Sequence, residues 1–425
     1  MEKIKNKIKS LWNSGAIHII IGSFATKFVT LFGSVFLVRL MSKNDYGLLS
    51  YIENLYSFVF LLGGLGVANG TLRYVVLGRT LEEKKGFYNY FLRVSIVINI
   101  IIIILMNIVN IFYTHPADYS NSKVLLGIML ISLPFQYIFE NNLATERAMF
   151  QYKQYAFLSF ACATGVIFGK LVGAFLGDIT GVILVTLGVY CFFGLFSTYK
   201  VEKQLFHDVK IEKLNKTIKK DTLIYSIQFM FVNGLWTLFM LSDVFLMGKL
   251  GVSPTELADY KIAYVWPANI SIVGSCIATF VTPYFVKNEN NYSWVKKNFA
   301  IVYLGNFLIT LVIAIGVFAL SKPLILLYAG QKYLNTIPLM RTILVGAVIN
   351  NGLRMITANT FSAMGKVKYN MVVSIFAFCM QIILNVKFIP ILGVYSVAYT
   401  SIVVYSFMAI VLLAVFIKEY YLIKK

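Results

Sequence analysis

The chain has 425 residues, of which 59% are hydrophobic, 16% are aromatic and only 13% are charged. A soluble protein carries about 25% charged residues, whereas the mean hydropathy here is +0.76. The net charge of +20 lies between the apolar runs, as the positive-inside rule requires. The sequence therefore predicts a polytopic membrane protein, and its basic charge gives no reason to expect a nucleic-acid partner.

Residues 1–14 place apolar side chains at helical spacing between lysines. This pattern predicts either an amphipathic helix on the membrane surface or a basic flank that only sets topology. About twelve transmembrane helices follow, together with a basic linker at 200–220 and a tail at 418–425. The expected helices are 15–38, 48–71, 87–112, 124–146, 155–177, 179–199, 221–249, 258–285, 298–320, 336–361, 369–389 and 392–417.

Lys and Arg are distributed unevenly between the two sets of loops. With the N-terminus inside, the inner segments hold roughly five times as many basic residues as the outer ones. We therefore expect both termini and the linker 200–220 to lie on the cytoplasmic side.

Two short matches indicate an internal repeat. "DYGLLSYI" from Asp45 matches "DYKIAYV" from Asp259, and "AMFQYKQY" from Ala148 matches "AMGKVKY" from Ala363, at offsets of 214 and 215. The predicted fold is all-α, with two six-helix lobes (15–199 and 221–417) related by a parallel pseudo-two-fold repeat. This architecture favours a transporter with its path between the lobes. A channel is the alternative, but no re-entrant filter-like sequence occurs.

Several cations fall inside or beside expected helices, where a charge is costly unless it faces water or a partner. Lys27 shares one face of the first helix with Ser23, Thr30 and Ser34. This stripe predicts either the wall of a cavity or hydrogen bonds between helices.

Four more basic residues are candidates for a cationic cavity. Arg354 shares a face with Asn350, and Lys170 lies near the middle of the fifth helix. Arg341 lies nearer the outer end of its helix, where it either faces the cavity or extends to the membrane surface. Arg39 ends the first helix, where an outer vestibule should open.

Acidic residues inside the expected helices are the candidates for ion coupling or gating: Asp243, Glu53 and Glu140. Arg147 lies two helical turns after Glu140, which allows an ion pair, a gate or ion coupling. Asp243 fits proton or sodium linkage, or else pairing with a basic residue of another helix. Pro267 is a candidate hinge.

Glycine recurs at every fourth position in "FGKLVGAFLGDITG", at residues 169, 173, 177 and 181, which predicts close helix packing. No Walker A, nucleophile elbow or HExxH motif occurs, and Cys and His form no ligand constellation. We therefore expect neither an enzyme nor a bound cofactor or metal.

These features together resemble the polysaccharide flippases (Wzx-like O-antigen and capsule repeat-unit transporters) of the multidrug/oligosaccharidyl-lipid/polysaccharide exporter superfamily. The resemblance covers nearly the whole chain, although "LADY" and "VYSVAYT" depart from the family pattern. The residues that carry it include Arg39, Leu40, Ser42, Asp45, Tyr46, Gly47, Gly64, Gly66, Arg73, Ser242, Asp243, Gly248, Gly330, Tyr333, Asn385, Pro390 and Gly393.

The resemblance implies a flippase that moves undecaprenyl-diphosphate-linked oligosaccharides across the bacterial cytoplasmic membrane. Lys27, Arg354, Lys170 and Arg341 would then meet the anionic diphosphate in a cationic cavity. An ion gradient or the membrane potential would supply energy, and polysaccharide polymerase and chain-length proteins are expected partners. The alternatives are a cation-coupled multidrug antiporter, a flippase for another lipid-linked polymer precursor, and a membrane glycosyltransferase or polymerase. Short outer loops oppose this last alternative.

Overall fold

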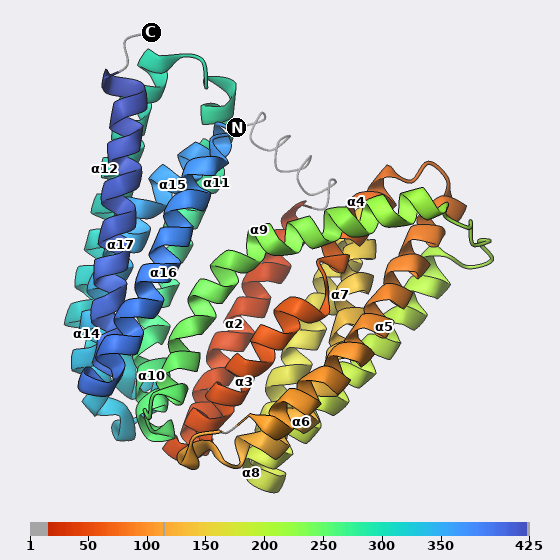
Figure 1. Ribbon diagram of the computed structural model, residues 1–425, viewed down its shortest axis with the longest axis horizontal. Helices are drawn as coiled ribbons and strands as arrows, with labels where there is room; N and C mark the ends of the chain where they lie inside the picture. Colours follow the sequence, from red (N-terminus) through yellow and green to blue (C-terminus); the bar gives the residue numbers. More distant parts are fainter. Residues whose placement is uncertain (1–15, 114, 423–425) are drawn as a thin grey trace, which may run out of the picture. The chain divides into compact units, whose positions relative to one another are not determined.

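The computed structural model describes residues 16–113 and 115–422 (Figure 1). The segment 1–14, predicted as either an amphipathic helix or a basic flank, lies outside them, as do the last three residues of the tail. The described residues form helices and no β-strand. The chain divides into two compact units, Met1–Thr237 and Leu238–Lys425, and each is described by itself. The prediction of an all-α, two-lobed protein is thereby confirmed.

The described part of the first unit contains seven α-helices, one short turn and the start of a further helix. They are α2 (Ala16–Leu40), α3 (Lys43–Gly63), α4 (Val67–Leu77), α5 (Leu81–Phe112), the short turn Ala117–Tyr119, α6 (Ser122–Leu130), α7 (Leu133–Ala148), α8 (Tyr152–Leu205) and the beginning of α9 (Lys216–Lys249). The boundary between the units falls inside α9. The non-helical part of the basic linker is shorter than the expected 200–220, because α8 and α9 extend into it from both sides.

The second unit holds the rest of α9 and the remaining helices. They are α10 (Pro254–Asn269), α11 (Ser271–Lys287), α12 (Tyr292–Ala319), α13 (Ser321–Ala329), the turn Gln331–Thr336, α14 (Ile337–Val348), a π-helical turn (Ile349–Arg354), α15 (Met355–Ala363), α16 (Val367–Leu392), α17 (Val394–Ile417) and a terminal π-helical turn (Lys418–Leu422). Its core includes Phe299 and Phe416, whose ring centroids lie 3.7 Å apart.

The order of helices in the first unit recurs in the second. In both, the expected second span is broken in two, as α3 and α4 or as α10 and α11. The Ser42 hydroxyl accepts from the Asp45 N–H at the start of α3, and Ser253 accepts from the Glu256 N–H at the start of α10. A serine cap therefore begins the helix in both units, and the sequence match of Asp45 to Asp259 stays a prediction.

Local chemistry accounts for the breaks. Gly66 begins α4 with a φ of 69°, and a Cβ there would lie 2.1 Å from the Ser226 carbonyl oxygen of α9. Only glycine meets both demands. Pro267 lies in the last turn of α10, which ends at Asn269, and its missing N–H removes one backbone hydrogen bond from that turn. Its role as a hinge stays a prediction.

The long helix α8 is two arms joined at Gly177 and Asp178, where the backbone is non-helical. This break agrees with the expected helices 155–177 and 179–199. A Cβ built on Gly173 would lie 2.4 Å from the Gly181 carbonyl oxygen, so the arms meet backbone to backbone at these glycines. The predicted close packing is confirmed for this pair.

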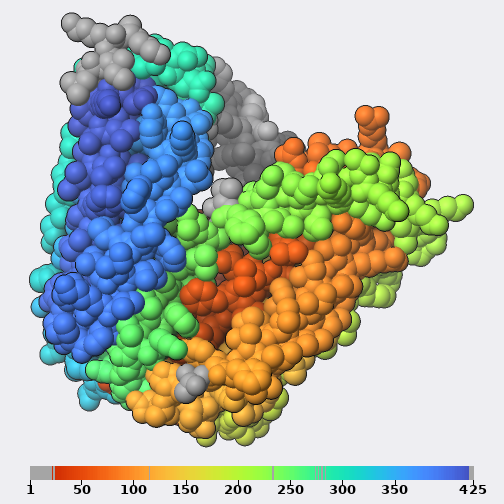
Figure 2. All heavy atoms as spheres, in the orientation of Figure 1, coloured from red at the N-terminus to blue at the C-terminus, as the bar shows by residue number. Residues whose placement is uncertain are grey.

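Apolar surface covers the outside of the described helices. On α5, Ile104, Leu105 and Phe112 are 56%, 54% and 82% exposed, and Figure 2 shows α5 and the start of α9 on one face of the first unit. Seven helices, or nine if each bent pair is one span, are long and apolar enough to cross a membrane within the described ranges. The two arms of α8 count once in these totals. Such surface suits contact with lipid, and the expected count of twelve is not established.

Candidate functional site

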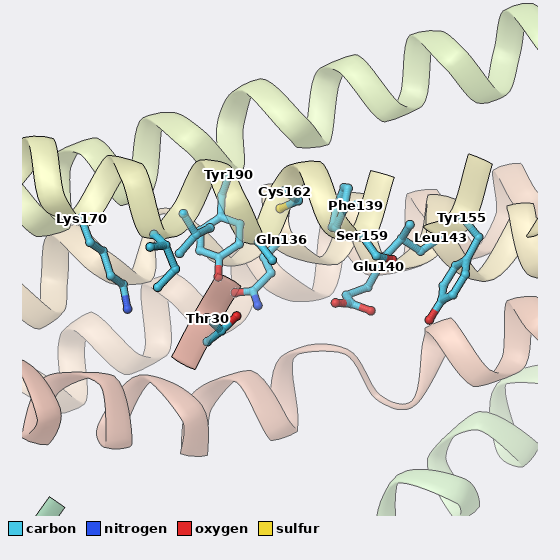
Figure 3. A pocket seen from close by; sticks show the side chains of 13 residues that line it. Thr30, Gln136, Phe139, Glu140, Leu143, Tyr155, Ser159, Cys162, Lys170 and Tyr190 are labelled. Atoms are coloured by element: carbon cyan, nitrogen blue, oxygen red, sulfur yellow. The ribbon is translucent and has the colours of Figure 1, made fainter. Parts of the chain in front are cut away.

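A pocket of about 390 Å³ lies within the first unit, between α2, α7 and α8 (Figure 3). From Tyr155 to Lys170 the lining residues of α8 recur at intervals of about one turn, so they share one face of its first arm. Tyr190 comes from the second arm. The lining residues are Thr30, Gln136, Phe139, Glu140, Leu143, Tyr155, Ser159, Cys162, Ala163, Val166, Ile167, Lys170 and Tyr190. Three of the predicted residues, Thr30, Glu140 and Lys170, are therefore brought together.

Lys170 lies at one end of this pocket (Figure 3). It forms an ion pair with Glu53 of α3. The Lys170 Nζ is 2.5 Å from the Glu53 Oε1, and the two side chains are 17% and 35% exposed. The two charges largely balance each other. The sequence marked both residues as candidates but gave no sign that they meet.

Glu140 extends into the same pocket, and its carboxylate forms no hydrogen bond or ion pair with any described residue. The Arg147 guanidinium, two turns further along α7, instead lies over the Tyr155 ring, 5.4 Å from its centroid. The ion pair considered between Glu140 and Arg147 is thus not formed here. Roles for both residues in gating or coupling stay predictions.

Lys27 lies one turn before Thr30 on α2, and its side chain is exposed. It forms no hydrogen bond or ion pair with the described residues. The Thr30 hydroxyl donates to the Thr26 carbonyl oxygen at 2.8 Å, and the side chain of Ser23 lies outside the described part. Arg39 is also exposed, at the end of α2. The first helix therefore presents Lys27 one turn from the pocket-lining Thr30, and Arg39 at its far end.

Asp243 occupies a polar cluster inside the second unit. Its Oδ1 accepts hydrogen bonds from the Gln381 Nε2 at 2.6 Å and from the Asn385 Nδ2 at 2.8 Å. The side-chain oxygens of both amides are buried and have no hydrogen-bond partner. Amides of α16 therefore hold this carboxylate by hydrogen bonds.

Gln381 was not predicted as a site residue, and Asn385 was noted only for the family resemblance. Their spacing of four on one apolar helix is the signal that could have found them. Three pocket residues of the first unit, Gln136, Tyr155 and Tyr190, were also not predicted from the sequence. A single polar residue on an apolar helix does not reveal that it faces a pocket.

The remaining predicted cations lie elsewhere in the second unit. Arg354 ends the π-helical turn Ile349–Arg354, and its Nε donates to the Asn350 Oδ1 at 2.5 Å. The shared face predicted for these two residues is confirmed. Such turns are frequent at functional sites. Arg341 donates to the Ser321 hydroxyl at 3.1 Å and lies over the Phe318 ring, which favours a role in holding helix ends together.

Comparisons with known proteins agree with this arrangement. A family model described as "Polysaccharide biosynthesis protein" matches residues 36–338, and no curated protein sequence matches the chain. The lipid II flippase MurJ in an inward closed conformation is 15% identical with a TM-score of 0.70, over 94% of this chain and 87% of that one.

Two further solved structures share the fold. An inward-facing multidrug resistance MATE transporter of the MOP superfamily is 15% identical with a TM-score of 0.68, over 91% of this chain and 92% of that one. A MOP superfamily transporter from Pyrococcus furiosus, whose binding pocket is described as reversed in polarity, is 15% identical with a TM-score of 0.60, over 96% and 95%. The chain belongs to the polysaccharide biosynthesis protein family and has the fold of the MOP-superfamily transporters.

Proposed function

We propose that this protein is a flippase for lipid-linked oligosaccharides. It would move undecaprenyl-diphosphate-linked repeat units from the inner to the outer leaflet of the bacterial cytoplasmic membrane by alternating access. Both termini would lie in the cytoplasm. The repeat units would pass to a polysaccharide polymerase and chain-length proteins, and the protein itself would transport without catalysing a reaction.

The observation that carries this proposal is the exposed ammonium of Lys27 on an apolar helix. An uncompensated charge in a membrane-spanning helix is costly, and an anionic substrate would offset that cost. Among the described residues Lys27 has no partner, whereas Lys170 is balanced by Glu53. A diphosphate suits such a cation because its charge is opposite and because hydrogen bonds between ionised groups are stronger than those between neutral groups. The family match supports a polysaccharide precursor as the substrate.

We also propose that Asp243 couples transport to a cation. The carboxylate accepts from the NH2 groups of Gln381 and Asn385, whose unpartnered side-chain oxygens are buried; if both amides turned over, they would add two hard oxygen ligands beside the carboxylate. Such a set suits sodium, and the carboxylate alone suits a proton. Binding of either ion would neutralise the Asp243 carboxylate. The hydrogen bonds from Gln381 and Asn385 could then rearrange.

The test is a reconstituted flipping assay with a fluorescent undecaprenyl-diphosphate oligosaccharide in proteoliposomes. Lys27→Ala should slow flipping strongly, Lys27→Arg should retain much of it, and Lys287→Ala, at the end of α11, should leave it unchanged. Equal rates for Lys27→Ala and the wild type would contradict the proposal. Efflux of a lipophilic cation without lipid flipping would favour the drug antiporter, and a preference for a peptidoglycan or teichoic-acid precursor would favour another polymer.

A further inference from the structure

The pocket of the first unit contains hydrogen-bonding groups that no described residue uses. The Gln136 Oε1 accepts from the Tyr56 hydroxyl at 2.7 Å, so its Nε2 remains for a ligand. The hydroxyl groups of Tyr155, Ser159 and Tyr190 form no hydrogen bond with the described residues. Unused donors and acceptors in a cavity require water or a polar ligand.

The charge in this pocket is small. The ion pair to Glu53 balances Lys170 at one end, and Arg147, which lies over the Tyr155 ring near the other end, keeps its charge but does not line the pocket. Glu140 alone presents an unpaired carboxylate to the space between them (Figure 3). A carboxylate accepts several hydrogen bonds from hydroxyl groups but repels another anion. The pocket therefore suits a neutral, hydroxyl-rich ligand better than a phosphate.

Aromatic walls complete the chemistry. Phe139, Tyr155 and Tyr190 line the pocket together with the polar groups. A sugar ring has an apolar C–H face that packs on aromatic side chains and an edge of hydroxyl groups. The cavity of about 390 Å³ equals the space of roughly a dozen liquid water molecules, which is room for a short saccharide. The geometry points to a saccharide-binding subsite that holds neutral or N-acetylated sugars and disfavours acidic ones.

The position of this subsite fits a lipid-linked substrate. Thr30 lines the pocket, and Lys27 lies three residues earlier on α2, which places the two side chains on one face. If Lys27 meets the diphosphate, the first sugars would lie within reach of the pocket. This step rests on the proposed function, whereas the binding of sugars by the pocket does not.

A lipophilic cation is the competing ligand, because Glu140 and the aromatic side chains would also attract it. One carboxylate would satisfy such a cation, however, and would leave the Gln136 amide and three hydroxyl groups without partners. A buried polar group without a partner costs free energy, so the saccharide accounts for more of the pocket.

The experiment measures ligand binding to the purified full-length protein by saturation-transfer NMR and calorimetry. The probes are N-acetylglucosamine, its disaccharide, glucuronic acid, inorganic phosphate and tetraphenylphosphonium. We expect the neutral sugars to bind, the disaccharide most tightly, and glucuronic acid to bind more weakly than N-acetylglucosamine.

Two variants locate the site. Glu140→Gln should weaken neutral-sugar binding about tenfold, because hydrogen bonds to a charged group are stronger, and should reduce the discrimination against glucuronic acid. Tyr190→Phe should weaken binding roughly two- to tenfold by the loss of one hydrogen bond. Tyr199→Phe, on the same arm of α8 but exposed, is the matched control and should bind as the wild type does. Each variant tests the site independently if the other fails to fold.

Three results would overturn the inference: no sugar binding, sugar binding that neither variant weakens, or tighter binding of glucuronic acid or tetraphenylphosphonium than of neutral sugars. The flipping assay separates this inference from the proposed function. Flipping without sugar binding in the pocket would refute only the subsite. Sugar binding that both variants weaken, without flipping, would refute only the transport proposal.

Discussion

Replacing Gly173 by alanine tests how the two arms of α8 form the pocket. A Cβ at this position would lie 2.4 Å from the Gly181 carbonyl oxygen and 2.7 Å from the Val182 Cα. Ordinary contact begins near 3.4 Å, so the arms would have to separate by about 1 Å. Both obstructing atoms are backbone, and no side chain can rotate away to relieve the clash.

The magnitude follows from two opposing terms. Overpacking of this kind costs about 1–3 kcal/mol. The cost lies near the upper end of that range when backbone atoms must move. Alanine returns about 1 kcal/mol through its helix propensity. Gly173→Ala should therefore lower the free energy of unfolding by about 1–2 kcal/mol. It should also widen the pocket, because Lys170 and Tyr190 lie on opposite arms.

Gly188→Ala is the matched control, because nothing lies within 4 Å of the added Cβ. The substitution should raise stability by about 0.5–1 kcal/mol. Chemical denaturation in detergent, followed by tryptophan fluorescence, compares the two variants with the wild type. If Gly173→Ala is as stable as Gly188→Ala, the arms do not pack through these glycines, and this account of the pocket is wrong.

Lys170→Met should lower the free energy of unfolding by about 1–2 kcal/mol because it leaves Glu53 without its partner. Denaturation of the double variant Lys170→Met/Glu53→Gln should show most of that loss restored. Asp243→Asn should make flipping independent of the sodium or proton gradient in proteoliposomes, and unchanged dependence on both gradients would exclude it as the coupling group. Burial alone would lower the pKa of Lys366, but its hydrogen bond and ion pair with Glu419 raise that pKa above 10.5. The stabilisation is therefore complete at neutral pH and is lost as the pH rises through the raised pKa. Denaturation at several pH values should show wild type and Lys366→Met converging only in strong alkali.

Periodicity and composition predicted what depends on one helix at a time. The hairpin break at Gly177, the packing of Gly173 and the placing of Thr30 on a cavity wall all follow from residues close together in sequence. The two-unit organisation also followed, because the basic linker and the repeat are visible in the residue order.

Contacts between distant helices could not be predicted in this way. Lys170 and Glu53 are 117 residues apart, and Asp243 is 142 residues from Asn385. Whether two such side chains meet depends on the rotation and depth of each helix, which the hydrophobic pattern leaves open.

The charges that have partners and those that lack them together indicate how a substrate would lie in the first unit. Lys170 and Glu53 balance each other, so they offer a ligand little free energy unless their pair opens. Lys27 and Glu140 have no such partner among the described residues, and they differ in sign. An anionic ligand would gain most at Lys27, and a hydroxyl-rich one would gain most at Glu140. A lipid-linked oligosaccharide contains both groups in succession, and Thr30 connects the two places along one face of α2. The order of groups in the proposed substrate would then match the order of unsatisfied groups in the protein. A drug with a single positive charge would match only one of them.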